Sequence, residues 1–331
     1  MDPERAFQKD FVSRLDEATI GVPSKAVAEA IGISTGTLSK RRLGISAFTA
    51  YEMCRLAERF GVSLTTTPAP DTARFVFEAD TAHARGLDPE RYLARLEGAI
   101  AEAGGELDSA QLTIATTDIP LLWLLGEPDL VAAKLYAFTV AAATRVPEPL
   151  DLDALPSTWA ARAAAVAEAH ERVASVEVWG TRPLLAFLQD VERLALARCL
   201  DAVAVERIAA AIARVVERMF EAAAESRKAG GGAFELYTNG AHSSSPILGL
   251  RTGVYRAVHL TLDYPHAMSA YGPGAYAYLE RYVSRLRAQA TRVSGVGQAN
   301  SRALRAELLK RIGDRRARAL GLLEMAEATP L

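Results

Sequence analysis

The stretch Val27-Ala28-Glu29-Ala30-Ile31-Gly32-Ile33-Ser34-Thr35-Gly36-Thr37-Leu38-Ser39-Lys40-Arg41-Arg42 predicts two short helices joined by a tight turn. Gly32 can end the first helix because a glycine takes a positive φ without a Cβ clash. Ser34 can cap the second helix, since its hydroxyl accepts a hydrogen bond from an orphan backbone N–H. Ala28 is small enough for the two helices to cross closely. The stretch therefore predicts a helix-turn-helix.

The side chains of this stretch separate into an apolar side and an outer face. The apolar side packs the two helices together and consists of Val27, Ile31, Ile33 and Leu38. The outer face is small, polar and basic, and the DNA-binding residues expected from it are Ser34, Thr35, Gly36, Thr37, Ser39, Lys40, Arg41 and Arg42. Cations bind DNA phosphates, and base edges give sequence selectivity. DNA binding is the leading hypothesis, and a helix-turn-helix that contacts only protein is the alternative.

The three consecutive cations Lys40, Arg41 and Arg42 lie at the end of the second helix. In that position they can clamp phosphates, or they can form a solvated helix end that complements the helix dipole. The helix start at Thr35 lacks the Asn, Gln or Arg that reads a base through two hydrogen bonds. The outer face therefore predicts docking on DNA better than it predicts an operator sequence.

The composition limits the class of protein. The chain has 331 residues, 50% of them hydrophobic, which suggests two or three domains with a sizeable core. The formal net charge is only −2, so attraction to DNA must come from a local patch. Cys54 and Cys199 are each expected to be a buried free thiol. No segment resembles a signal peptide or approaches the roughly 18 apolar residues of a membrane span, so we expect a cytoplasmic protein.

Helical periodicity surrounds the motif and ends near residue 65. Apolar residues within 3–17 predict a preceding helix, and Ser46 opens a later helix that Gly61 ends. Pro68 and Pro70 then indicate a boundary. We therefore expect a DNA-binding bundle of four or five helices over residues 1–67, followed by a dimerisation and sensory domain over residues 68–331.

Most of the larger domain has the periodicity of amphipathic helices. The expected helices span residues 88–103, 129–144, 157–173, 181–200, 203–228, 274–291 and 299–326. Alternating apolar residues predict short strands over residues 74–78, 111–115, 234–237 and 254–260. The predicted fold class is mainly α: an N-terminal five-helix bundle with the helix-turn-helix, plus a larger, mostly helical domain with a few β-strands.

Residues 24–64 resemble the XRE, or phage-repressor-like, helix-turn-helix family. The resemblance rests on Ala28-x-x-x-Gly32-x-Ser34, on Thr37-Leu38-Ser39 and on the helix Leu56-Ala57-Glu58-Arg59-Phe60-Gly61-Val62-Ser63. It implies a five-helix bundle that inserts its third helix into the major groove, usually as a dimer. The remainder is similar to the long C-terminal regions of bacterial regulators that carry such an N-terminal domain, which suggests an architecture and no chemistry.

No motif of the chain predicts catalysis. The five histidines lack metal-ligand spacing. The loop Ser294-Gly295-Val296-Gly297-Gln298 precedes a helix but lacks the lysine of a P-loop, and a helix-connecting loop is the favoured interpretation. His242 beside Ser243 is expected in a flexible hairpin loop. We therefore expect no enzyme activity, no cofactor and no metal.

The segment 302–318 carries seven basic residues against two acidic ones. It can contact nucleic acid, or it can be the solvated face of an amphipathic helix, which we favour. In the second case its apolar stripe packs inward: Leu304, Leu308, Leu309, Ile312 and Leu320.

These observations lead to two functional hypotheses. The first is a sequence-specific transcriptional regulator that binds operator DNA as a homodimer and responds to a small-molecule or protein effector. The alternative is an antitoxin or immunity-repressor-like protein whose C-terminal domain binds a protein partner. Four aromatic residues can line an effector groove or can belong to the core, which we favour: Trp123, Tyr136, Trp179 and Phe187. An enzyme tethered to DNA lacks any motif, and no membrane partner is expected.

Overall fold

The computed structural model describes residues 3–62, 78–79, 90, 93–94, 97–98, 109–142, 148–240, 246–253, 255–263, 266–295 and 299–328. The predicted boundary after residue 67 lies outside these residues, as do most of the helix expected over 88–103 and the strand expected over 74–78. Within the described part, no helix combines the length and apolar character needed to cross a membrane.

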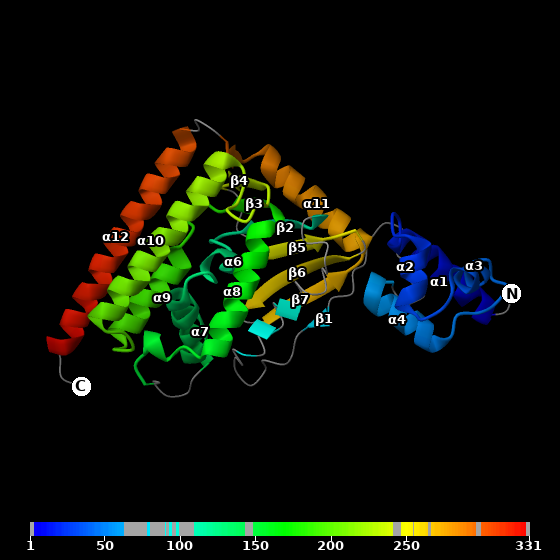
Figure 1. Ribbon diagram of the computed structural model, residues 1–331, viewed down its shortest axis with the longest axis horizontal. Helices are drawn as coiled ribbons and strands as arrows, with labels where there is room; N and C mark the ends of the chain where they lie inside the picture. Colours follow the sequence, from blue (N-terminus) through cyan, green and yellow to red (C-terminus); the bar gives the residue numbers. More distant parts are fainter. Residues whose placement is uncertain are drawn as a thin grey trace.

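The N-terminal unit contains four described helices around one apolar core (Figure 1). They are α1 (Pro3–Ala18), α2 (Ser24–Ala30), α3 (Thr35–Arg42) and α4 (Ala50–Phe60). The core they share consists of Phe11, Leu15, Val27, Ala28, Ile31, Leu38, Phe48, Leu56, Phe60 and Val62. The expected five-helix bundle was wrong, since residues 3–62 form four helices. The expected helix start at Ser46 was also early, because the capping box of Thr49 and Glu52 starts α4 at Ala50.

The larger unit is built on an eight-stranded mixed sheet, so the prediction of a mainly α fold with a few strands was wrong. The strands are β1 (Glu78–Ala79), β2 (Gln111–Thr116), β3 (Ala174–Trp179), β4 (Phe234–Thr238), β5 (Ile247–Arg251), β6 (Arg256–Asp263), β7 (His266–Tyr271) and β8 (Thr291–Arg292). Their order across the sheet is β1-β7-β6-β5-β2-β3-β4-β8. The central strands β2, β3 and β4 are parallel, and the other neighbouring pairs are antiparallel.

Helices cover both faces of this sheet. They are α6 (Leu121–Leu124), α7 (Pro128–Ala142), the 3₁₀ turn η2 (Leu152–Ala154), α8 (Ser157–Arg172), α9 (Leu185–Leu196), α10 (Ala202–Glu225), α11 (Pro273–Ala288) and α12 (Ala299–Ala328). Neighbouring residues of β4 point to opposite faces. Leu236 packs in the core formed with α9, α10 and α12, whereas Tyr237 packs in the core formed with α11. The parallel strands are therefore enclosed between two helical layers, as parallel sheets usually are.

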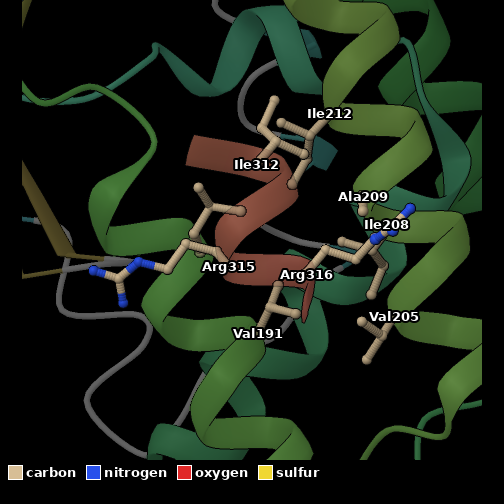
Figure 2. Close-up of a pocket in the computed structure, with 9 residues that line it drawn as sticks. Val191, Val205, Ile208, Ala209, Ile212, Ile312, Arg315 and Arg316 are labelled. Carbon is tan, nitrogen blue, oxygen red and sulfur yellow. The ribbon is translucent and has the colours of Figure 1, made fainter. Parts of the chain in front are cut away.

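The basic segment 302–318 lies on α12, which packs along α9 and α10 (Figure 1). Figure 2 shows Ile312 of α12 facing Ile212 of α10, whereas the Arg315 guanidinium points away from them. Arg315 pairs with Glu192 of α9 at 2.7 Å, and Arg305 also forms an ion pair, with Glu217 of α10. The stripe Leu304, Leu308, Leu309, Ile312 and Leu320 packs against the core as predicted. Much of the positive charge of this segment is therefore matched within the protein.

Neither the gap in Figure 2 nor the aromatic residues provide an effector groove. The gap holds about 10 Å³. That volume is at or below what one water molecule requires, so no ligand fits there. Trp123, Trp179 and Phe187 are buried in the largest core, and Tyr136 packs against it. These aromatics therefore hold the fold together rather than line an open site.

A cluster of polar side chains lies inside this unit, between β3 and α8. The Glu177 carboxylate accepts hydrogen bonds from the indole N–H groups of Trp123 and Trp179, at 3.1 and 3.0 Å. His170 Nε2 lies 3.6 Å from the same carboxylate. The Lys228 ammonium donates to the backbone carbonyl of His170 at 2.6 Å. Glu177, His170 and Lys228 are all buried, so this is a charged cluster without direct solvent.

The two units meet where the end of α4 touches the β7–α11 junction. A Cβ placed on Gly61 would overlap with the backbone carbonyl of Tyr271, and a Cβ on Gly272 would overlap with that of Phe60. Both glycines also have positive φ values, +67° and +99°. The contact is therefore backbone against backbone, and it depends on glycine on both sides.

Candidate nucleic-acid interface

The turn between α2 and α3 has the geometry expected of a helix-turn-helix. Gly32 has φ +69°, and the amide of Ile33 donates to the Ala28 carbonyl at 3.0 Å, which closes the end of α2. The Ser34 hydroxyl accepts from the Thr37 amide at 3.1 Å and so caps α3. The predicted roles of Gly32 and Ser34 are therefore confirmed at the level of local geometry.

Packing then determines which side of α3 faces solvent. Val27 and Ala28 of α2 and Leu38 of α3 are buried in the N-terminal core. The exposed predicted residues are Ser34, Thr35, Gly36, Ser39 and Lys40, and Thr37 is half-buried. Figure 1 places α3 at the end of the molecule opposite to α12, with the sheet on the other side of the N-terminal unit. The small, polar face of α3 is therefore open to a long ligand.

The Arg41 guanidinium is engaged within the protein. It donates to the Glu52 carboxylate at 2.8 Å, and both side chains are largely buried. The other oxygen of Glu52 accepts from the Thr49 amide, as part of the capping box that starts α4. Arg41 therefore joins the end of α3 to the start of α4.

Arg42 has a similar internal role. It pairs with Asp16 at 3.0 Å and donates to the Thr19 hydroxyl at 3.0 Å, both at the end of α1. A longer hydrogen bond of 3.4 Å reaches the Ser24 hydroxyl at the start of α2. Two of the three cations at the end of α3, Arg41 and Arg42, therefore tie this helix to its neighbouring helices.

Two exposed lysines remain on this part of the N-terminal unit. Lys40 at the end of α3 forms no ion pair with any residue that the structure describes. Lys25 at the start of α2 is 81% exposed and lies 3.9 Å from Glu29, the outer limit of an ion pair. The sequence pattern did not single out Lys25, although its place directly after Ser24 puts it in the first turn of a helix that borders the motif.

We expect Arg41→Ala to destabilise the N-terminal unit by about 1–3 kcal/mol, because it leaves the buried Glu52 carboxylate without its cation. Urea unfolding of the full chain, followed by circular dichroism, measures the loss. The control Lys40→Ala changes an exposed side chain of the same helix and should stay within about 0.5 kcal/mol of the parent protein. Equal losses in the two variants would show that Arg41 is not a structural residue.

No protein-family model, no curated protein and no solved structure matches this chain.

Among the residues that the structure describes, no group of three or more His, Cys, Asp or Glu side chains is placed to hold a metal ion. Both cysteines are free thiols, and Cys199 is buried as predicted, whereas the predicted burial of Cys54 was wrong because its side chain is exposed.

Proposed function

We propose that this chain is a DNA-binding transcriptional regulator that lays α3 in the major groove. The observation that carries the proposal is the exposed face of α3, in which small polar residues lead to Lys40 at the helix end. A short helix without bulky side chains on its outer face can approach base edges closely, and a lysine at its end can bind a flanking phosphate. The solvated N-terminal amides of the helix also favour a phosphate group.

We propose that the regulator binds as a homodimer. An eight-residue helix offers few base contacts, and two copies on half-sites about one helical turn apart double them. The electrostatic attraction of each copy is modest, since residues 3–60 hold nine basic and seven acidic side chains, and Arg41 and Arg42 are paired internally. Affinity should therefore depend on few phosphates and fall only moderately with salt.

Selection of bound DNA from a random pool, followed by mobility shift in a salt series, tests the proposal. We expect Lys40→Ala to weaken binding and to reduce the slope of log affinity against log salt by about 1 for each bound protomer, because one phosphate contact is lost. The matched control is Lys310→Ala, since Lys310 is an exposed lysine on α12, far from α3 (Figure 1). It should leave the slope unchanged.

Two results would contradict this function. A full chain that binds no member of the pool at low salt does not have a DNA-binding face. If Lys40→Ala and Lys310→Ala lower the slope equally, the attraction is not located at the end of α3. Light scattering of the complex on a selected site should give two chains per site, and a single chain would refute the dimer.

A further inference from the structure

A cavity of about 300 Å³ lies between the two units. Glu17 and Ile20, at the end of α1 and in the turn after it, line one side. The other side belongs to the sheet unit and includes Arg251, Arg256, Tyr276 and Glu280. Pockets for small molecules run from about 300 to 1,000 Å³, so this one suits a compact metabolite rather than a dinucleotide or a peptide.

We propose that this cavity binds a small metabolite through a carboxylate or phosphate group, and that its occupancy changes the affinity of the α3 face for DNA. The binding step stands on the cavity alone, whereas its effect on DNA rests on the proposed function.

Arg256 is the main anion-binding group of the cavity. In the described part of the chain, the hydrogen bond from its guanidinium is a long one, 3.4 Å to the backbone carbonyl of Ile20, and no carboxylate lies within ion-pair distance. A guanidinium has five N–H donors in a planar fork that matches a carboxylate or a phosphate. Most of the donor capacity of Arg256 therefore remains for a ligand.

Arg251 supports the same charge preference but is held in place by the protein. It pairs with Glu280 at 3.1 Å, donates to the Gln111 side chain, and lies 5.8 Å from the ring centroid of Tyr276. The adjoining helix α11 starts at Pro273 without a side-chain cap, so its positive end adds to the attraction. The ion pair with Glu280 leaves Arg256 and Glu17 as the unmatched charges of the lining.

Glu17 opposes a bound anion from the N-terminal side. Glu17 lines the same cavity as Arg256, and its carboxylate has no ion pair with the described residues. Removing this negative charge should tighten the binding of an anion, whereas removing the Arg256 charge should weaken it. A purely structural role for these two residues would not give opposite signs.

The cavity is connected to α3 through one turn of chain. Glu17 and Ile20 line the cavity. Their chain neighbours Asp16 and Thr19 bind the Arg42 guanidinium at the end of α3. A ligand that moves the end of α1 therefore moves the anchor of the DNA-binding helix. Binding of anion and DNA are then coupled, and linkage requires each to change the affinity of the other by the same factor.

Calorimetry on the full chain, without DNA, tests the binding step with pyrophosphate and citrate as probes at constant ionic strength. We expect at least one probe to bind, and the probe that binds more tightly shows whether the cavity prefers a phosphate or a carboxylate group. Arg256→Gln should lower the affinity for that probe at least tenfold, and Glu17→Gln should raise it several-fold. The matched control is Arg285→Gln, an exposed arginine of α11 that does not line the cavity, and it should change nothing.

The proposal is overturned if neither probe binds, if Arg256→Gln and Arg285→Gln have equal effects, or if Glu17→Gln weakens binding. The coupling is measured by mobility shift with and without the tighter probe, and an unchanged affinity for DNA refutes it. An anion that binds to a chain that binds no DNA refutes the proposed function and leaves the anion site intact. A chain that binds DNA but neither anion refutes the anion site and leaves the proposed function standing.

Discussion

Glu177→Ala is expected to lower the free energy of unfolding of the larger unit by about 3–5 kcal/mol, the usual cost of breaking a buried charge pair on one side. The substitution leaves the indole N–H groups of Trp123 and Trp179 without an acceptor, and it removes the carboxylate that faces the buried Lys228 ammonium. It also opens a cavity in a core that cannot relax fully. Urea unfolding followed by tryptophan fluorescence measures this loss directly, since both indoles are at the site.

Glu177→Gln separates charge from shape in this cluster. Burial lowers the pKa of Lys228 from 10.5 to about 8, and the Glu177 carboxylate opposes that shift. Without the carboxylate the folded-state pKa of Lys228 falls further. The unfolded state then binds more protons than the folded state over a wider pH range below 10.5, and binding of those protons destabilises the folded variant. The stability deficit of the variant should therefore be present below about pH 8, where Lys228 of the parent protein is charged, and should shrink as the pH rises through 8 toward 10.

The double variant Glu177→Gln with Lys228→Met provides the control for this interpretation. Because Lys228→Met removes the cation that the first change leaves unmatched, the double variant should lose less stability than the sum of the two single variants. If the two losses simply add, and the deficit of Glu177→Gln is the same at pH 7 and pH 9.5, then Glu177 contributes hydrogen bonds and packing but no charge pairing.

Gly272→Ala is expected to separate the two units while each keeps its own core. The new methyl group would overlap with the Phe60 carbonyl, and the residue would also have to keep φ +99°. Neither problem can be relieved by rotation of a side chain, because both sides of the contact are backbone. Small-angle scattering should then give a larger radius of gyration, and the affinity for the anionic probe should fall at least tenfold, since the cavity loses one wall.

Gly44→Ala is the matched control for this substitution. Gly44 also has a positive φ, +69°, but a Cβ there would meet nothing within 4 Å. It should cost about 1 kcal/mol of stability through backbone strain and leave both the radius and the anion affinity unchanged. If Gly272→Ala behaves like Gly44→Ala, the contact between Gly272 and Phe60 does not hold the units together.

The helix-turn-helix was predictable because its signals are local. Gly32, Ser34 and Leu38 lie within seven residues of one another, and each acts on its immediate neighbours. The sheet was not predictable to the same extent. β3 has Glu177 at its centre, and a charged residue argues against a buried strand unless its distant partners are known. β5 contains Gly249, and a residue with a Cβ would not fit there because the side chains of Tyr276 and Leu279 of α11 occupy that space.

The partners of the basic residues were also hidden from the sequence. Arg41 and Arg42 follow Lys40 directly, and the pattern gave no reason to treat the three differently. Their roles separate only when α1 brings Asp16 and α4 brings Glu52 to the end of α3. The same holds for the junction cavity, whose two walls are more than 200 residues apart along the chain.

The position of α12 has a consequence for how the chain forms during synthesis. The core of α1–α4 is complete once Val62 has emerged from the ribosome, and its contacts are local. The larger core needs Leu308, Ile312 and Ala319, so α9 and α10 keep apolar faces open to solvent until the last helix arrives. A nascent chain therefore carries a finished N-terminal unit while the apolar faces of the larger unit are still open to solvent.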